Sequence, residues 1–272
     1  MTALEAHSHY SAHDIEARIL AALRAAGMDP DRRLSPVDLG ALDHFHTGGF
    51  RASLALKELA QIRAEDRVLD LGAGLAGPAR MLAGAPGCHV DCIELSADYC
   101  VGARLLNRLT ALEGCIDIHE GSVLALPFPD DSFDVVWMQN VGMNIADKRR
   151  LYGEVYRVLK PDGRFAFQEI AAGEGPVTCF PLPWATSEAE SFLISIDGMR
   201  VALNQCGLVA EYFEDVSDVQ LGASANGTTE SGGRTPLSLS VYVDNLAQKA
   251  ENAARSLREH QIRLVRGVFR AK

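Results

Sequence analysis

The first part of the chain carries the apolar pattern of helices. Four apolar residues recur at helical spacing and predict an amphipathic helix over residues 13–27: Ile15, Ile19, Leu20 and Leu23. A Pro-rich break follows, and Ser35 before Pro36 is typical of a second, short helix start. Residues 43–49 end in two glycines and predict a loop before another helix over residues 50–62. We therefore expect residues 1–62 to form an N-terminal helical cap.

From Val68 the pattern changes to short apolar runs that alternate with amphipathic segments. The apolar runs predict strands over residues 67–71, 89–94, 115–119, 133–138 and 164–170. The segments between them predict helices over residues 77–84, 97–111 and 147–159. Strands that alternate with helices are typical of an α/β fold, in which a parallel sheet is covered on both faces.

The C-terminal third predicts the rest of such a domain. We expect a helix over residues 187–205 and a sixth strand over residues 208–216. The small and polar residues 221–236 predict a long loop. A polar helix near residues 243–260 and a strand over residues 262–269 end the chain. Residues 63–272 should then form one domain that makes a single structural unit with the cap.

Composition and charge narrow the class of partner. The 272 residues have 47% hydrophobic and 23% charged content, which is ordinary for a globular protein. A net charge of −10 without any cluster of Lys and Arg argues against nucleic acid or an anionic membrane surface. The apolar runs fall far short of a membrane span, and the N-terminus lacks the pattern of a signal peptide. We expect a small-molecule substrate, no nucleic acid and no membrane partner, and the oligomeric state stays open.

The cysteines indicate the redox compartment. The six cysteines lie at positions 88, 92, 100, 115, 179 and 206, without a Cys-x-x-Cys pair. Several of them fall inside predicted strands or helices. Neither a metal site nor a disulfide framework is indicated, so we expect reduced thiols and a cytoplasmic location.

A glycine-rich turn follows the first predicted strand. Residues 68–80 contain glycines at 72, 74 and 77, in the G-x-G-x-x-G spacing of a cofactor-binding turn, which brings the backbone close to a ligand. Asp70 lies two residues before the first of these glycines. Beside the pyrophosphate of a dinucleotide, this carboxylate would cost on the order of 1 to 4 kcal/mol of Coulomb energy. S-adenosylmethionine has no phosphate, so its ammonium could face Asp70 while backbone N–H groups face its carboxylate.

A second acid follows the next predicted strand. Glu94 lies 24 residues beyond Asp70 and can accept hydrogen bonds from both hydroxyls of a ribose. Since both cofactors contain a ribose, Glu94 does not discriminate between them.

Several stretches together resemble class I S-adenosylmethionine-dependent methyltransferases. These stretches are residues 68–80, 93–96, 121–134 and 159–163, which occur in the order and spacing of that superfamily. The chain looks most like the group of sarcosine/dimethylglycine, tocopherol and quinone-biosynthesis methyltransferases, to which residues 43–49 and 181–185 are also similar. The resemblance implies S-adenosylmethionine as cofactor and a doubly wound, Rossmann-like sheet of seven strands. In that fold the sheet is mostly parallel with an antiparallel last strand, and the cap is a lid.

The resemblance also implies which residues contact the cofactor. They are Asp70, Gly72, Ala73, Gly74 and Gly77 around the methionine part, Glu94 and Leu95 at the ribose and adenine edge, Gly121, Ser122 and Val123 around the adenine, and Gln139 and Asn140 at the methionine carboxylate and the incoming substrate. The chain departs from its relatives at Ser122, where they often carry Asp, and at Ala76, where they often carry Gly.

The reaction itself makes few demands on side chains. Methyl transfer is an in-line displacement at a carbon already activated by a sulfonium, so alignment and exclusion of water supply most of the catalysis. A neutral amine needs no base, whereas a phenol, a quinol or a carbon acid does. Candidate bases are His44 and His46 in the cap loop and Glu169 at the end of the fifth strand, with His46 ranked first and Glu169 kept beside it.

Three functions remain open at this point. The first is methyl transfer to an amine, a phenol or quinol, or an activated carbon of a small molecule. The second is an NAD(P)-dependent oxidoreductase, which the glycine spacing alone would also allow. The third is a noncatalytic module that keeps the cofactor fold.

Overall fold

The protein is built around one mixed sheet of seven strands. The computed structural model describes residues 14–85, 87–225 and 236–272. The strands are β1 (Arg67–Leu71), β2 (His89–Glu94), β3 (Ile116–Glu120), β4 (Phe133–Gln139), β5 (Leu159–Ala172), β6 (Leu208–Asp215) and β7 (Ile262–Ala271). They lie in the order β3-β2-β1-β4-β5-β7-β6. Strands β1 to β5 pair in parallel, and β7 inserts antiparallel between β5 and β6, as the resemblance implied.

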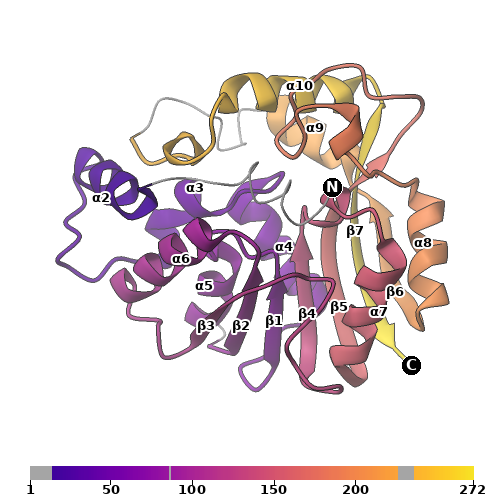
Figure 1. Cartoon of the computed structure of the whole chain (residues 1–272), viewed down its shortest axis with the longest axis horizontal. Helices are drawn as coiled ribbons and strands as arrows, with labels where there is room; N and C mark the ends of the chain where they lie inside the picture. Colours follow the sequence, from indigo (N-terminus) through magenta and orange to yellow (C-terminus); the bar gives the residue numbers. More distant parts are fainter. Residues whose placement is uncertain (1–13, 86, 226–235) are drawn as a thin grey trace.

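Helices cover both faces of this sheet (Figure 1). Alternate residues of the central strands face opposite layers because side chains of a strand alternate in direction. Leu69 and Leu71 pack in one core with α7 (Lys148–Val158) and α8 (Ile196–Gln205). Val68 packs in the other core with α4 (Gly49–Ala60) and α5 (Gly77–Gly84).

The remaining helices lie around the carboxyl ends of the parallel strands and at one edge of the sheet. The cap contributes α2 (Ile15–Ala25), the 3-10 helix η1 (Pro36–Leu39) and α3 (Gly40–Asp43), and α2 packs against α6 (Ala97–Leu109). Near the C-terminus, α9 (Ser217–Ala225) and α10 (Leu246–Arg258) both contact β7. Figure 1 shows α9 and α10 together above the strand ends. None of the helices in the described part of the chain has the length and hydrophobicity that crossing a bilayer needs.

The elements predicted up to residue 158 are present with shifted ends. Side chains cap the first turns of α6 and α7, because Ser96 accepts a hydrogen bond from Tyr99 N and Asp147 accepts one from Arg150 N. Strand β5 is longer than predicted and begins at Leu159, with a register shift against β4. The division between cap and domain at residue 62 stays a prediction.

Two predictions on the C-terminal side are wrong in part. The helix predicted over residues 187–205 begins only at Ile196, after a short 3-10 helix, η3 (Glu188–Glu190). The chain between them is held extended, because Phe192 N donates to Met143 O and Ser195 pairs with Ala172 at the sheet edge. The loop predicted over residues 221–236 overlaps the second half of α9, and residues 226–235 lie outside the described part.

Candidate active site

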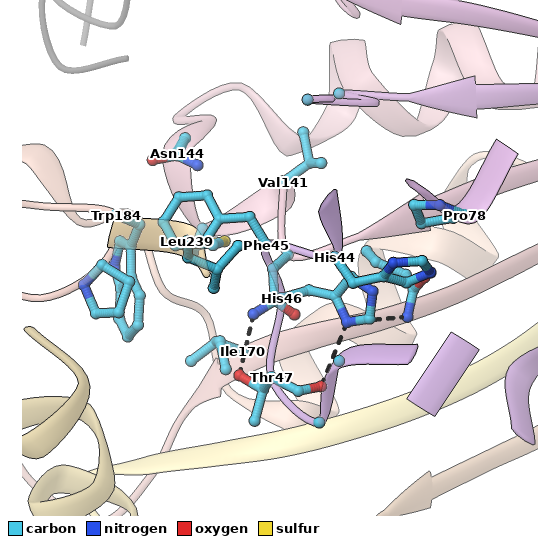
Figure 2. A pocket seen from close by; sticks show the side chains of 18 of the residues that line it. His44, Phe45, His46, Thr47, Pro78, Val141, Asn144, Ile170, Trp184 and Leu239 are labelled. Carbon is cyan, nitrogen blue, oxygen red and sulfur yellow. Dashed lines mark hydrogen bonds between the residues drawn. The ribbon is translucent and has the colours of Figure 1, made fainter. Parts of the chain in front are cut away.

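A cavity of about 530 Å³ opens at the carboxyl ends of the parallel strands. Ligands of open α/β sheets bind at this edge, where the order of the strands reverses on either side of β1. Polar residues that follow β1, β2 and β4 line one end of the cavity, and apolar residues from the cap, β5 and α10 line the other. Figure 2 shows part of this lining, with Phe45, Leu239 and Trp184 grouped away from Pro78.

Asp70 lies at the polar end of the cavity, on β1. Its residue is only 3% exposed, and its Oδ2 atom has no hydrogen-bond partner within the described ranges. Burial, and then the nearby Glu94, raise the pKa of Asp70 to about 8. A buried carboxylate without a partner is costly, so this oxygen is suited to a ligand that brings a donor and a positive charge.

The glycine turn is shaped for close approach, but its N–H groups are already used. Gly72 and Gly74 adopt φ values of 64° and 56°, which glycine reaches without strain. The N–H groups of Gly72 and Ala73 donate to Ile93 O, and that of Gly74 donates to Glu94 Oε2 at 2.8 Å. These three groups therefore do not receive a ligand carboxylate, contrary to the expectation from the sequence. They are equally unavailable to a pyrophosphate.

Glu94 is fixed beside this turn. Its Oε2 accepts from Gly74 N and its Oε1 from Ser96 N, each at 2.8 Å. Burial raises the pKa of Glu94, and these backbone hydrogen bonds oppose the rise. Each carboxylate oxygen has two lone pairs, so Glu94 can still accept from the hydroxyls of a ribose.

The adenine-side candidates follow the next two strand ends. Leu95, Gly121, Ser122 and Val123 all line the cavity beside Glu94. The Ser122 hydroxyl accepts from Leu124 N at 3.2 Å, which holds the turn after β3. Apolar side chains flanked by one hydroxyl fit a flat base with polar edges.

Gly77 serves packing, because it does not line the cavity. A Cβ atom at Gly77 would lie 2.3 Å from Asp43 O and 2.6 Å from His44 Nδ1. Only glycine lets α5 approach the cap loop this closely. The third glycine of the motif therefore joins cap and sheet in this chain.

The same joint contains a buried ion pair that sequence reasoning missed. Asp43 accepts from Arg80 Nη2 at 2.8 Å and from His44 Nδ1 at 2.6 Å, while Arg80 Nη1 donates to Asn107 Oδ1. Burial alone would raise the pKa of Asp43, but Arg80 and His44 hold it below its ordinary value. The available signal was an arginine inside the otherwise small and apolar segment around residues 77–83.

His46 lies in a closed hydrogen-bond network rather than facing the cavity freely. Ser53 Oγ donates to Gln139 Oε1 at 2.9 Å, so His46 Nε2 must donate to Ser53 Oγ at 3.0 Å. His46 Nδ1 then accepts from Gln139 Nε2 at 3.4 Å. Trp137 Nε1 also donates to Gln139 Oε1. Burial, and then His44, lower the pKa of His46 to about 3, so its ring is neutral.

Asn140 offers a second unpartnered acceptor. Its Nδ2 donates to Thr47 Oγ1 at 3.1 Å, whereas its Oδ1 is buried without a partner within residues 14–85, 87–225 and 236–272. Asn140 directly follows β4, which pairs in parallel with β1, so Asn140 and Asp70 lie at neighbouring strand ends.

Glu169 does not reach the cavity. It is not among the lining residues, and its Oε1 accepts from Val141 N at 2.8 Å and from Gly142 N at 3.0 Å. Burial raises the pKa of Glu169 to about 7. Its position below the loop after β4 suits support of that loop, and it does not suit contact with a substrate.

The residues at the polar end fit S-adenosylmethionine. Two buried acceptor oxygens of this end have no partner among the described residues, and these oxygens, Asp70 Oδ2 and Asn140 Oδ1, match the donors of an ammonium. The carboxylate of Glu94 matches a ribose, and the turns after β2 and β3 leave an apolar slot for a base. On the glycine turn, the N–H groups of Gly72, Ala73 and Gly74 already donate within the chain, so they are not available to a pyrophosphate.

Comparisons with known proteins agree with this site. A model of the methyltransferase domain matches residues 69–167. Residues of the chain are 38% identical, over 157 residues, to a glycine/sarcosine/dimethylglycine N-methyltransferase of Actinopolyspora halophila. That match covers 58% of this chain but 28% of the relative, so the chain spans well under half of that protein's length.

Solved structures share the fold at low identity. A structure provisionally described as a sarcosine dimethylglycine methyltransferase, from Galdieria sulphuraria, superposes with a TM-score of 0.65 at 21% identity, covering 91% of this chain and 96% of that one. The crystal structure of the [4+2]-cyclase SpnF superposes with a TM-score of 0.69 at 20% identity, covering 100% of this chain and 97% of that one. At these identities the likeness shows the fold alone.

The fold and the site resemble those of class I S-adenosylmethionine-dependent methyltransferases. The family model that matches the stretch from β1 into β5 is that of the methyltransferase domain.

Proposed function

We propose that the protein transfers a methyl group from S-adenosylmethionine to a small-molecule acceptor. The observation that carries the proposal is the buried Asp70 Oδ2, which faces the cavity without a partner in the described part of the chain. A ligand cation at this oxygen relieves the cost of burying the carboxylate. A dinucleotide pyrophosphate would increase that cost, and nothing in the comparisons supports an oxidoreductase.

The chain's own residues bind and orient the cofactor and enclose it together with the acceptor. The cofactor supplies a methyl group on a sulfonium, which makes the carbon electrophilic. In this proposal Asp70 and Asn140 hold the ammonium, Glu94 orients the ribose, and the residues after β2 and β3 enclose the adenine. Rate acceleration then comes from fixing the acceptor in line with the methyl group in a site that excludes water.

We propose that His46 is a positioning residue of the cap, a role that its hydrogen bonds to Ser53 and Gln139 support. Its low pKa makes it a weak base, whereas its hydrogen bonds to Ser53 and Gln139 fix the end of β4 against α4. His46→Ala should lower turnover by about tenfold to a hundredfold while sparing cofactor affinity. Glu169 is proposed to act through the Val141–Gly142 backbone.

The matched control for His46 is Ser53→Ala, which removes one member of the network and keeps the imidazole. We expect it to lower turnover less than His46→Ala. Steady-state rates should be measured beside calorimetric titration of S-adenosylmethionine. Wild-type rates in His46→Ala would leave the histidine with a purely structural role.

The activity itself is tested by two separate measurements. Calorimetry should show S-adenosylmethionine binding more tightly than NADH or NADPH, and release of S-adenosylhomocysteine should depend on an acceptor. Tighter binding of a nicotinamide cofactor would establish the oxidoreductase instead. Normal cofactor binding without turnover on a broad acceptor panel would indicate a noncatalytic module or another reaction, as the fold of a [4+2]-cyclase illustrates.

A cytoplasmic location is also proposed. All six cysteines are free thiols, and three of them, Cys88, Cys92 and Cys100, are buried. A reducing compartment supports this state.

A further inference from the structure

The acceptor end of the cavity differs in chemistry from the cofactor end. We propose, resting on the function proposed above, that the methyl acceptor has an uncharged, apolar body rather than the zwitterionic form of an amino acid. This departs from the glycine derivatives named for the similar Actinopolyspora protein.

Large apolar side chains from separate segments form this end. They are Phe45 from the cap loop, Ile170 from β5, Trp184, Leu239 from the 3-10 helix η4 (Leu239–Val241), Leu257 from α10 and Leu264 from β7. Phe45, Leu239 and Trp184 lie close together in Figure 2, with Ile170 nearby. Segments so far apart in the sequence meet here only in the folded chain, so the apolar surface belongs to one built compartment.

The polar atom of the largest side chain is already satisfied. Trp184 Nε1 donates to Ser191 Oγ at 3.0 Å. Trp184 is also almost fully buried. Its ring therefore presents only carbon atoms to a ligand, and this favours binding of an apolar group.

Within the described part of the chain, every basic side chain that lines the cavity already has a partner. Among described residues that line the cavity, the basic side chains are His44, His46 and Arg258. The two histidines belong to the cap joint and to the β4 network. Arg258 donates to Glu251 at 2.8 Å, and its side chain is 54% exposed at the end of α10.

A desolvated carboxylate without a cationic partner is strongly disfavoured. An amino acid acceptor would have to place its carboxylate against carbon atoms or beside the acids of the cofactor end. An acceptor with an alkyl or aryl body avoids this cost and gains from burial instead. The lining therefore selects the body of the acceptor, and it leaves open whether N, O or C receives the methyl group.

The test is equilibrium binding of defined probes to the full chain, with and without S-adenosylhomocysteine. The probes are 4-alkylphenols from ethyl to hexyl, the carboxylate analogue 6-(4-hydroxyphenyl)hexanoate, hexylamine and sarcosine. We expect the affinity of the phenols to rise about fourfold per methylene, which corresponds to about 0.8 kcal/mol. The carboxylate analogue should bind at least a hundredfold more weakly than 4-hexylphenol, and sarcosine should show no binding at millimolar concentration.

A pair of variants distinguishes binding in the cavity from nonspecific hydrophobic binding elsewhere on the protein. Leu239→Arg places a cation at the apolar end, and Leu239 is only half-buried, so the fold should tolerate it. This variant should bind 4-hexylphenol more weakly and the carboxylate analogue more tightly than the wild type does. The matched control Val201→Arg, on the exposed side of α8, should change neither.

The proposal is overturned by a flat alkylphenol series, by equal effects of the two variants, or by sarcosine or the carboxylate analogue binding more tightly than 4-hexylphenol. Binding of S-adenosylhomocysteine is measured in the same samples. Its absence would remove the proposed function, whereas the probe series without cofactor would still report the chemistry of the apolar end.

Discussion

Asp43 and Asp70 are both buried carboxylates, yet their surroundings are opposite. Asp43 is 2% exposed and lies between Arg80 and His44, whereas Asp70 is 3% exposed and has the carboxyl group of Glu94 nearby. The pKa of Asp43 is held below its ordinary value, and the pKa of Asp70 is raised to about 8. A carboxylate compensated within the chain supports the fold, and one left uncompensated at a cavity is available to a ligand.

The two sites are also connected. Arg80 lies on α5, the helix that follows Asp70 and the glycine turn in the sequence. Asp43 holds the cap loop against that helix by accepting a hydrogen bond from Arg80. The structural carboxylate therefore fixes the cap over the cavity that the functional carboxylate serves. The stability that the Asp43 site contributes to the fold allows the chain to keep Asp70, which destabilises the folded protein in the absence of a ligand.

Removing the cation from the compensated site should have the largest effect. Arg80→Met leaves Asp43 buried beside His44 alone, and we expect the free energy of unfolding in urea to fall by about 3 to 5 kcal/mol. Adding Asp43→Asn should recover a large part of this loss. The control Arg108→Met removes an exposed arginine from α6 and should cost less than about 1 kcal/mol. A loss below 1 kcal/mol in Arg80→Met would show that the two carboxylates do not differ in the way described.

Neutralising the uncompensated site should stabilise the empty protein in a pH-dependent way. The folded pKa of Asp70, about 8, lies above the unfolded value of 3.8, so the folded protein holds a proton that the unfolded chain has lost in this window. Wild-type stability should therefore fall as the pH rises from about 4 to about 8.

Asp70→Asn removes that group from the titration. The free energy of unfolding of both proteins is measured without cofactor at pH 5 and pH 8. We expect the variant to be more stable relative to the wild type at pH 8 than at pH 5. An equal difference at both pH values would mean that Asp70 is ionised throughout.

Asp70→Ala should weaken cofactor binding. Loss of a charged hydrogen-bonding partner corresponds to about 1 to 3 kcal/mol, or roughly fivefold to 150-fold in the dissociation constant of S-adenosylmethionine. Calorimetric titration measures this change. The exposed Asp117, away from the cavity on β3, supplies the control Asp117→Ala, which should bind as the wild type does. An unchanged dissociation constant in Asp70→Ala would remove the argument for an ammonium at this position.

The smallest effect is expected at Ala76, the N-cap residue of α5. Its φ of 59° is left-handed, a conformation that costs a residue with a Cβ about 1 to 2 kcal/mol and suits glycine. Ala76→Gly should raise the free energy of unfolding by up to about 1 kcal/mol, since the entropy of glycine offsets part of the gain. The control Ala79→Gly, inside α5, should lower it by about 1 kcal/mol. Equal losses in the two variants would show that the left-handed backbone at Ala76 carries no strain.

Local pattern was enough for most of the fold. Apolar runs and amphipathic segments predicted β1 to β4 and α5 to α7 within a few residues, because these elements satisfy their own periodicity and hydrogen bonds. It failed at residues 187–195, where contacts with Met143 and Ala172 hold the chain extended. The doubly wound sheet of seven strands with an antiparallel last strand came from the family resemblance and was confirmed.

The candidate site divides in the same way. The motif alone placed Asp70, Glu94 and the glycines at strand ends, since a strand followed by a turn points its last residues at one edge of the sheet. Only the tertiary structure decided that Asp43 is paired and Asp70 is not, that Glu169 lies outside the cavity, and that the apolar end lacks an available cation among the described lining residues. Compensation of a buried charge depends on which distant segment packs against it, and a linear pattern does not contain that information.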